Sequence, residues 1–154
     1  MNFLMISIVV GLIALAVALM LSSAIGKAPA GTARMQEIAG YIHEGAMAFL
    51  FREYKALSAF VIVVAIVISM FLSPLTAVCF VAGAVFSVCA GYIGMTVATK
   101  ANVRTAAAAQ HGGMPEALKI AFSGGAVMGL GVVGLGIVGV AAAYMLFGNI
   151  DIVT

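Results

Sequence analysis

Side chains that could take part in chemistry are few in this chain, and most of them lie in two polar segments. His43 and Glu44 are adjacent and could begin a metal site, because imidazole and carboxylate groups are common metal ligands. No second pair follows at ligand spacing, so the exposed face of an amphipathic helix is the favoured interpretation. His111 precedes two glycines and is expected to be solvated.

The run HGGMPEALK at residues 111–119 resembles a phosphate-binding loop only superficially. Such a loop ends in lysine followed by serine or threonine and comes directly after a strand, and neither feature is present. Five basic residues are expected to form a cytoplasmic rim that meets anionic lipid headgroups, with an anionic substrate as the alternative. These residues are Arg34, Arg52, Lys55, Lys100 and Arg104.

The two cysteines do not suggest chemistry either. Cys79 and Cys89 are separated by ten helical residues, or about 15 Å, which exceeds the ~7 Å limit for bridged α-carbons. We expect both to be free packing residues. No long basic run with interleaved aromatic residues suggests nucleic-acid binding. The sequence therefore predicts no catalytic, cofactor-binding or metal-binding residue in this chain.

The elements that carry these residues are predicted to be membrane helices. Hydrophobic residues make up 65% of the chain and charged residues only 8%, and the mean hydropathy is +1.27. These values exclude an ordinary soluble domain and indicate an integral membrane protein. The first apolar stretch lacks a positively charged leader, so a retained helix is favoured over a cleaved signal peptide.

Four uncharged stretches predict an all-α, antiparallel, single membrane domain over residues 1–154. The first would rise about 34 Å as a helix, enough to cross a hydrocarbon core of about 30 Å. Thr32 is expected to cap the second helix, and Ser73-Pro74 to begin the third. The predicted spans are residues 3–25, 56–72 with a helical extension from about 33, 75–99 and 120–147.

The basic residues predict the orientation. All seven lysines and arginines lie between Lys27 and Lys119, in the segments 26–55 and 100–119, whereas Asp151 alone marks the opposite side. By the positive-inside rule, these two segments are cytoplasmic loops and both termini are extracytoplasmic. The expected location is the cell membrane, as a multi-pass protein.

Small residues dominate the predicted third and fourth helices. Gly125 and Gly129 form a GxxxG pair, with Gly136 near the same face, so close packing against each other or against helices outside this chain is expected. Generic helix packing is favoured over a ligand groove. Because none of the four predicted spans contains an ionisable residue, the chain is not expected to be a complete transporter or pump.

Three segments strongly resemble the N-terminal region of membrane-integral inorganic pyrophosphatases, the ion-pumping enzymes. They are GTARMQEIAGYIHEGAMAFLFREYK at 31–55, GYIGMTVATKANVRTAAAA at 91–109 and EALKIAFSGGAVMG at 116–129. Their order and spacing relative to the predicted spans make the combined resemblance specific, and it covers nearly the whole chain.

The resemblance implies a homodimer of many helices in two concentric rings, with both termini extracytoplasmic. It also implies Mg²⁺-dependent hydrolysis of pyrophosphate at a cytoplasmic site, coupled to outward movement of H⁺ or Na⁺, with K⁺ as a candidate second cofactor. The family's aspartate-rich motifs lie in later helices, and no equivalent occurs before Thr154. We therefore assign none of its catalytic residues to this chain.

The sequence thus predicts the first four helices of a larger pyrophosphatase bundle, which supply scaffold and are inactive alone. The alternative is a non-enzymatic four-helix membrane subunit or assembly factor.

Overall fold

The computed structural model describes residues 2–148, and its regular elements are all α-helices. They are α1 (Asn2–Lys27), α2 (Ala33–Phe71), α3 (Pro74–His111) and α4 (Gly113–Phe147). Each is long and apolar enough to cross a membrane, by length and composition. The described part of the chain therefore confirms the predicted all-α fold with four membrane-span candidates. Asp151, which was expected to mark the extracytoplasmic side, lies outside the described residues.

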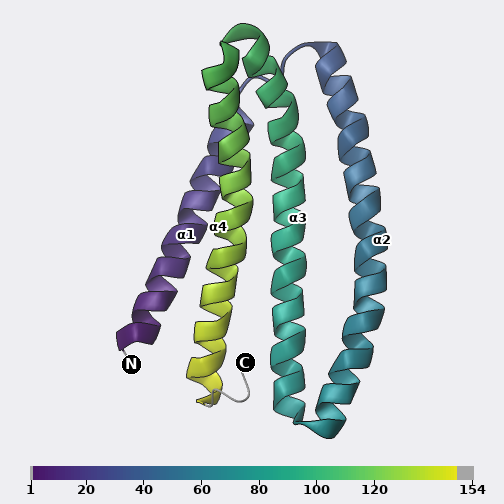
Figure 1. Cartoon of the computed structure of the whole chain (residues 1–154), viewed down its shortest axis with the longest axis vertical. Coiled ribbons are helices and arrows are strands. Elements are labelled where there is room, and N and C mark those ends of the chain that lie inside the picture. Colours follow the sequence, from purple (N-terminus) through teal and green to yellow (C-terminus); the bar gives the residue numbers. More distant parts are fainter. Residues whose placement is uncertain (1, 149–154) are drawn as a thin grey trace.

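The helices run alternately up and down, so consecutive helices are antiparallel (Figure 1). The start of α1, the end of α4 and the α2–α3 turn lie at one end of the bundle. The α1–α2 and α3–α4 connections lie at the opposite end, which is uppermost in Figure 1 and which we call the upper end. The segments that hold most of the basic residues therefore meet at the upper end.

Two predicted helix starts are confirmed by their capping contacts. Thr32 precedes α2, and its hydroxyl oxygen accepts a hydrogen bond from the backbone N–H of Met35 at 3.3 Å. Ser73 precedes α3, and its hydroxyl oxygen accepts from the N–H groups of Leu75 and Thr76 at 3.1 and 3.4 Å. Pro74 occupies the first helical position, where its missing N–H costs no helical bond.

The polar segment 100–119 contains more helix than expected. α3 was predicted to end near Thr99, but it continues to His111, and only Gly112 separates it from α4. The four consecutive alanines at 106–109 favour helix, and the chain reverses only at Gly112-Gly113, where Gly113 has a φ of 72°. The expected boundary marked a change in polarity and not the end of the helix.

The core of the bundle is formed by α1, α3 and α4. In Figure 1, α4 lies between α1 and α3, and α2 stands at the outer edge beside α3. Among the described helices, α2 contacts only α3, and Leu50 is the only buried residue described in α2. The buried cluster lies toward the upper end and consists of Ala18, Ile25, Val97, Ala101 and Val127.

Close helix packing within this chain uses glycines outside the predicted GxxxG pair. Gly11 of α1 and Gly134 of α4 cross so tightly that a Cβ on Gly134 would lie 3.1 Å from the Gly11 carbonyl oxygen. The predicted set of Gly125, Gly129 and Gly136 faces open space, because a Cβ on any of them would meet nothing within 4 Å. The GxxxG spacing therefore identified a glycine face of α4, but not the face that packs within this chain.

The relative heights of α2 and α3 show a further difference from the sequence expectation. Tyr54 contacts Val88, and His43 contacts Thr99, so the upper membrane boundaries expected at residues 56 and 99 lie about 20 Å apart. A single membrane boundary cannot lie at both of these heights. The charged half of α2 therefore runs beside an apolar part of α3, and Glu44, Arg52, Glu53 and Lys55 are all exposed on it.

Candidate functional site

His43, the first metal-ligand candidate, is instead a contact between α2 and α3. Its Nδ1 lies 3.0 Å from the Thr99 hydroxyl oxygen. That hydroxyl is placed to donate to the carbonyl oxygens of Met95 at 3.0 Å or Thr96 at 3.1 Å, so we assign Nδ1–H as the donor toward Thr99. His43 thus joins two helices, while the neighbouring Glu44 is exposed.

Within residues 2–148 no three histidine, cysteine, aspartate or glutamate side chains are grouped so that they could hold a metal ion. Cys79 and Cys89 are both free, as expected. The remaining glutamates, Glu37, Glu53 and Glu116, are exposed and belong to three different parts of the bundle. The described donor set therefore does not fit a divalent metal centre.

The run HGGMPEALK forms the turn between α3 and α4. His111 is exposed at the end of α3, and the Glu116 side chain folds back over Gly112. Glu116 lies in the first turn of α4, where a negative charge is favoured by the helix dipole, and Gly112 supplies no side-chain cap. The glutamate thus places a negative charge at this helix N-terminus.

The Arg104 side chain of α3 hydrogen-bonds to the end of α1, and we call this contact the Arg104 clasp. Its Nε donates to the Ala28 carbonyl at 3.1 Å, and its Nη2 donates to the Gly26 carbonyl at 3.3 Å. Its Nη1 also donates to the carbonyl of Lys100 at 2.9 Å. The last carbonyls of a helix lack partners within the helix and favour a cation, so one guanidinium fixes the exit of α1 against α3.

Tyr54 makes a second contact between α2 and α3. Its hydroxyl donates to the Val88 carbonyl oxygen at 3.0 Å and also lies beside Gly91, where an added Cβ would approach the hydroxyl oxygen to 2.9 Å. The small Gly91 thus leaves room for the tyrosine. Together with His43, this residue fixes the register of α2 on α3.

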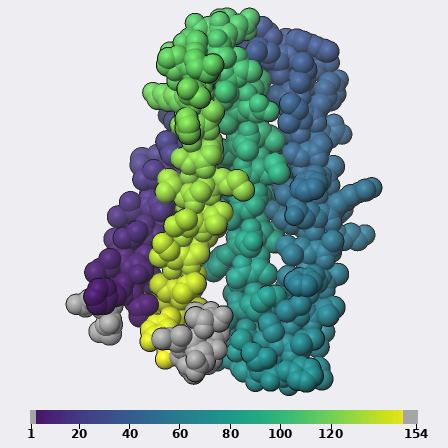
Figure 2. Space-filling model, viewed as in Figure 1, coloured from purple at the N-terminus to yellow at the C-terminus, as the bar shows by residue number. Residues whose placement is uncertain are grey.

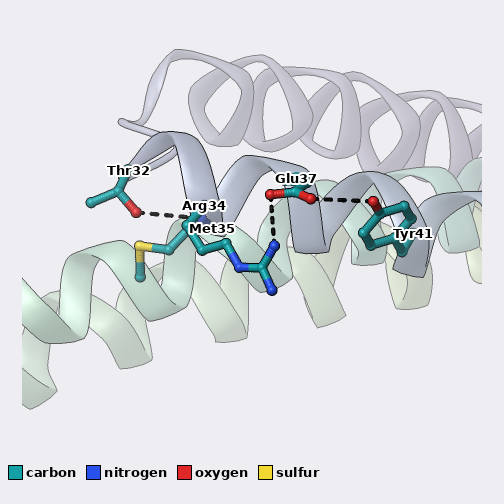
Figure 3. Close-up of polar contacts among 5 residues, drawn as sticks. All are labelled: Thr32, Arg34, Met35, Glu37 and Tyr41. Carbon is teal, nitrogen blue, oxygen red and sulfur yellow. Dashed lines mark hydrogen bonds and ion pairs between the residues drawn. The ribbon is translucent and has the colours of Figure 1, made fainter.

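A polar surface network lies at the start of α2 (Figure 3). Arg34 and Glu37 form an ion pair of 2.8 Å, and Tyr41 donates to the other Glu37 oxygen at 3.2 Å. Both charged side chains are largely exposed, and pairs of this kind contribute about 0–1 kcal/mol. The network organises one face of the upper end but forms no enclosed site.

A groove of about 680 Å³ lies between the lower halves of α3 and α4. Figure 2 shows the molecule hollowed there, between the teal and the yellow-green helices. No charged residue lines it, and its polar side chains are limited to Cys79 and Ser87 among the described lining residues. We call this feature the α3–α4 groove. The sequence analysis favoured generic helix packing and did not anticipate an open volume of this size.

Sequence reasoning missed Arg104, Thr99 and the Gly11–Gly134 crossing. The sequence analysis assigned Arg104 to the basic residues that meet lipid headgroups. No local sequence pattern indicates that a cation will lie beside the end of a helix that is distant in the sequence. Gly11 carried a weak signal, since it is the one glycine deep within the first apolar stretch. The partner of each residue lies more than fifty positions away and depends on tertiary packing.

Comparison with known proteins gives a consistent result. The family model described as "Inorganic H+ pyrophosphatase" matches residues 12–154. A putative K(+)-stimulated pyrophosphate-energized sodium pump of Clostridium tetani is 58% identical over 99% of this chain and 23% of its own length. A K(+)-insensitive pyrophosphate-energized proton pump of Methanosarcina mazei is 44% identical over 93% of this chain and 22% of its own.

A K(+)-stimulated pyrophosphate-energized sodium pump of Thermotoga maritima is 44% identical over 90% of this chain and 19% of its own length. The similarity therefore extends over almost all of the four-helix bundle. The chain spans only about a fifth of the length of these curated relatives.

Proposed function

The chain belongs to the inorganic H⁺ pyrophosphatase family, as an N-terminal segment of about four helices, and from this premise we propose that it is the scaffold-forming part of an ion-translocating membrane pump. The complete pump hydrolyses pyrophosphate and couples the reaction to transport of H⁺ or Na⁺. The names of the relatives include both ions and both K⁺-stimulated and K⁺-insensitive pumps. The single observation that carries the proposal is 58% sequence identity over 99% of this chain to a putative pump of this kind.

We assign the catalytic work to the polypeptide outside this segment. Binding of Mg²⁺ and pyrophosphate requires several convergent carboxylates, since Mg²⁺ is held by oxygen ligands in near-octahedral geometry. The glutamates of residues 2–148 are dispersed, and His43 and Arg104 are engaged in helix contacts. The residues present do not fit a Mg²⁺ site, so they take no direct part in the proposed hydrolysis.

The proposed orientation places the upper end in the cytoplasm and both termini outside. Lys27, Arg34, Lys100, Arg104 and Lys119 all belong to segments that meet at this end, in agreement with the positive-inside rule. Arg52 and Lys55 lie lower on α2, where long basic side chains can extend toward the headgroups. In the complete pump, this segment joins the remaining helices, and two pumps form a homodimer.

A chimaera tests the proposal. This chain would replace the matching segment of the Thermotoga maritima relative, and pyrophosphate hydrolysis with Mg²⁺ would be measured in membranes. We expect hydrolysis by the chimaera and none by residues 1–154 alone. Hydrolysis by the purified chain alone would show that it is not merely scaffold, while failure of the chimaera alongside an active parent pump would contradict a shared role.

The orientation has a separate test with single cysteines in a Cys79→Ser, Cys89→Ser background of the chimaera. Ala30→Cys lies in the upper α1–α2 connection and Leu72→Cys in the α2–α3 turn. In intact cells, a membrane-impermeant maleimide should label position 72 and not position 30. The reverse pattern would place the upper end outside.

A further inference from the structure

We propose that Arg52 and Lys55 of α2 bind the headgroup phosphate of an anionic phospholipid in the cytoplasmic leaflet, well below the upper membrane boundary of the other three helices. The inference rests on the proposed function, which supplies the cytoplasmic orientation and the longer polypeptide around this segment. It goes further by naming a lipid site, the residues that form it and the depth at which it lies.

The site lies on the side of α2 that points away from α3. The side against α3, which is the only described helix that α2 contacts, is marked by His43, Leu50 and Tyr54. At about 100° per helical residue, Arg52 lies about 200° from Tyr54 and Lys55 about 100° from it. Arg52 and Lys55 are three positions apart, which places their Cβ atoms about 5–6 Å from each other. Both side chains are exposed, so they form a pair of cations open to the surroundings of the bundle.

The described carboxylates leave this pair of cations unneutralised. Within residues 2–148 the one ion pair lies at the start of α2 and involves neither residue. Glu53 lies about 200° around the helix from Lys55, and adjacent residues such as Arg52 and Glu53 do not face each other. Glu44 is eight residues, or about 12 Å, above Arg52. An anionic headgroup offsets the remaining positive charge better than a zwitterionic one, which brings its own cation.

The pair lies deeper than the upper boundary of the other helices. Arg104 contacts the end of α1, and Gly124 of α4 lies beside Ala101 of α3, so the uncharged stretches of these three helices end at similar heights. His43 contacts α3 near the same height, and Arg52 lies nine residues, or about 14 Å, farther down α2. A membrane surface that was flat across the bundle would bury the two cations in hydrocarbon, where a charge is costly.

The apolar part of α2 is too short for an undisturbed bilayer. Below Lys55, the uncharged residues 56–72 rise about 25 Å, against a hydrocarbon core of about 30 Å. A short span is accommodated by local thinning of the bilayer and by basic side chains that extend to the headgroups. Arg52 and Lys55 stand at the upper end of this stretch, so phosphates that bind them also relieve the mismatch in length.

Phospholipid fits the outward face of α2 better than another helix does. Below the two cations this face presents Val63, Ile66 and Met70, which are 60%, 54% and 76% exposed. Interfaces between membrane helices favour small residues, and charges at their edge require protein partners. Large apolar side chains below two cations match the acyl chains and the headgroup of one phospholipid.

Spin labels on the outward face test the location in the full-length chimaera, in the Cys79→Ser, Cys89→Ser background. Ala48→Cys lies four residues before Arg52, and Ala59→Cys lies four residues after Lys55. In phosphatidylglycerol-containing vesicles, we expect the label at 59 to collide with oxygen only and the label at 48 to collide with a water-soluble nickel chelate. Low accessibility to both reagents would show that protein covers the face, and the same reagent reaching both labels would place the boundary elsewhere. Either result overturns the proposal.

A fluorophore at position 59 tests the lipid itself. Quenching by brominated phosphatidylglycerol is compared with quenching by brominated phosphatidylcholine at equal, low mole fractions. We expect phosphatidylglycerol to quench severalfold more strongly, and the double variant Arg52→Gln, Lys55→Gln to lose this preference. Arg34→Gln with Lys100→Gln is the control, because it removes the same charge from the upper end and should keep the preference.

Equal quenching by the two lipids in the unmodified chimaera would overturn the proposal. So would a preference that survives in the Arg52→Gln, Lys55→Gln variant, or one that is lost in both double variants, since the latter reflects overall charge. Failure of the proposed function is distinguishable, because it shows as lost pyrophosphate hydrolysis in the unlabelled chimaera, whereas quenching reports the lipid with or without hydrolysis.

Discussion

The two sides of this bundle are held together in different ways. α4 packs on α1 and α3 through glycines that allow backbones and side chains to approach closely, and none of its described side chains donates or accepts a hydrogen bond to another helix. α2 packs on α3 alone and does so through His43 and Tyr54, which hydrogen-bond across the interface. The interfaces of α4 depend on close packing, and the interface of α2 depends on hydrogen bonds.

The difference follows from what surrounds each interface. In lipid, apolar burial between helices gains little, so close van der Waals packing must hold the helices together. The upper half of α2 carries charged residues and is amphipathic, so it can place tyrosine and histidine against α3 and present charge elsewhere. A close-packed interface should be sensitive to a single added methyl group, whereas a hydrogen-bonded one should tolerate small changes.

The Gly11–Gly134 crossing gives the largest expected effect. In Gly134→Ala the new Cβ would lie 2.8 Å from Leu15 Cγ and 3.1 Å from the Gly11 carbonyl oxygen, which cannot move without shifting α1. We expect a loss of about 2–3 kcal/mol, the upper range for overpacked sites. Thermal unfolding of the chimaera in detergent measures it.

Gly129→Ala is the control for that substitution. Its Cβ would meet nothing within 4 Å in this bundle, and alanine is favoured over glycine in a helix by about 1 kcal/mol. Comparable destabilisation by the two substitutions would mean that glycine spacing alone, and not the crossing, determines sensitivity on α4.

The Arg104 clasp gives an intermediate effect and tests a polar contact outside the α2 interface. Arg104→Ala removes the donors to Gly26 and Ala28, and we expect a loss of about 1.5 kcal/mol, the low end for hydrogen bonds to charged groups, because water can reach these carbonyls. Hydrogen–deuterium exchange of residues 26–36 should increase.

Lys100→Ala is the matched control, because it removes an exposed basic side chain one turn earlier on the same helix. If both variants raise exchange equally, the effect comes from lost positive charge at the upper end and not from the clasp.

The same comparison shows what could be predicted from the sequence. Composition and hydropathy identified four helices, because apolar stretches of this length have few alternatives in a membrane, and local signals at Thr32 and Ser73 identified two helix starts. The GxxxG spacing does not mark the face of α4 that packs within this chain, because α4 carries glycines on more than one face and spacing does not say which one meets a neighbour.

The contacts of Arg104 and His43 could not be predicted for a related reason. Each depends on the relative height of two helices, which hydropathy does not encode, because it treats every helix alone. The same limit produced the two unequal boundaries at residues 56 and 99. The absence of site residues in the segment is still a prediction, and the chimaera tests it.

The smallest effect is expected on the α2 side. Tyr54→Phe removes only the hydroxyl that donates to Val88, and hydrogen bonds between membrane helices average about 0.6 kcal/mol in double-mutant cycles. The hydroxyl is also the Tyr54 atom nearest Gly91, so that contact is lost too, but His43 still contacts Thr99 and should keep α2 in register. Tyr92→Phe is the control, since Tyr92 is exposed on α3. A loss of stability in thermal unfolding as large as that of Gly134→Ala would show that α2 depends on this hydrogen bond as strongly as α4 depends on close packing. The contrast between the two interfaces would then not hold.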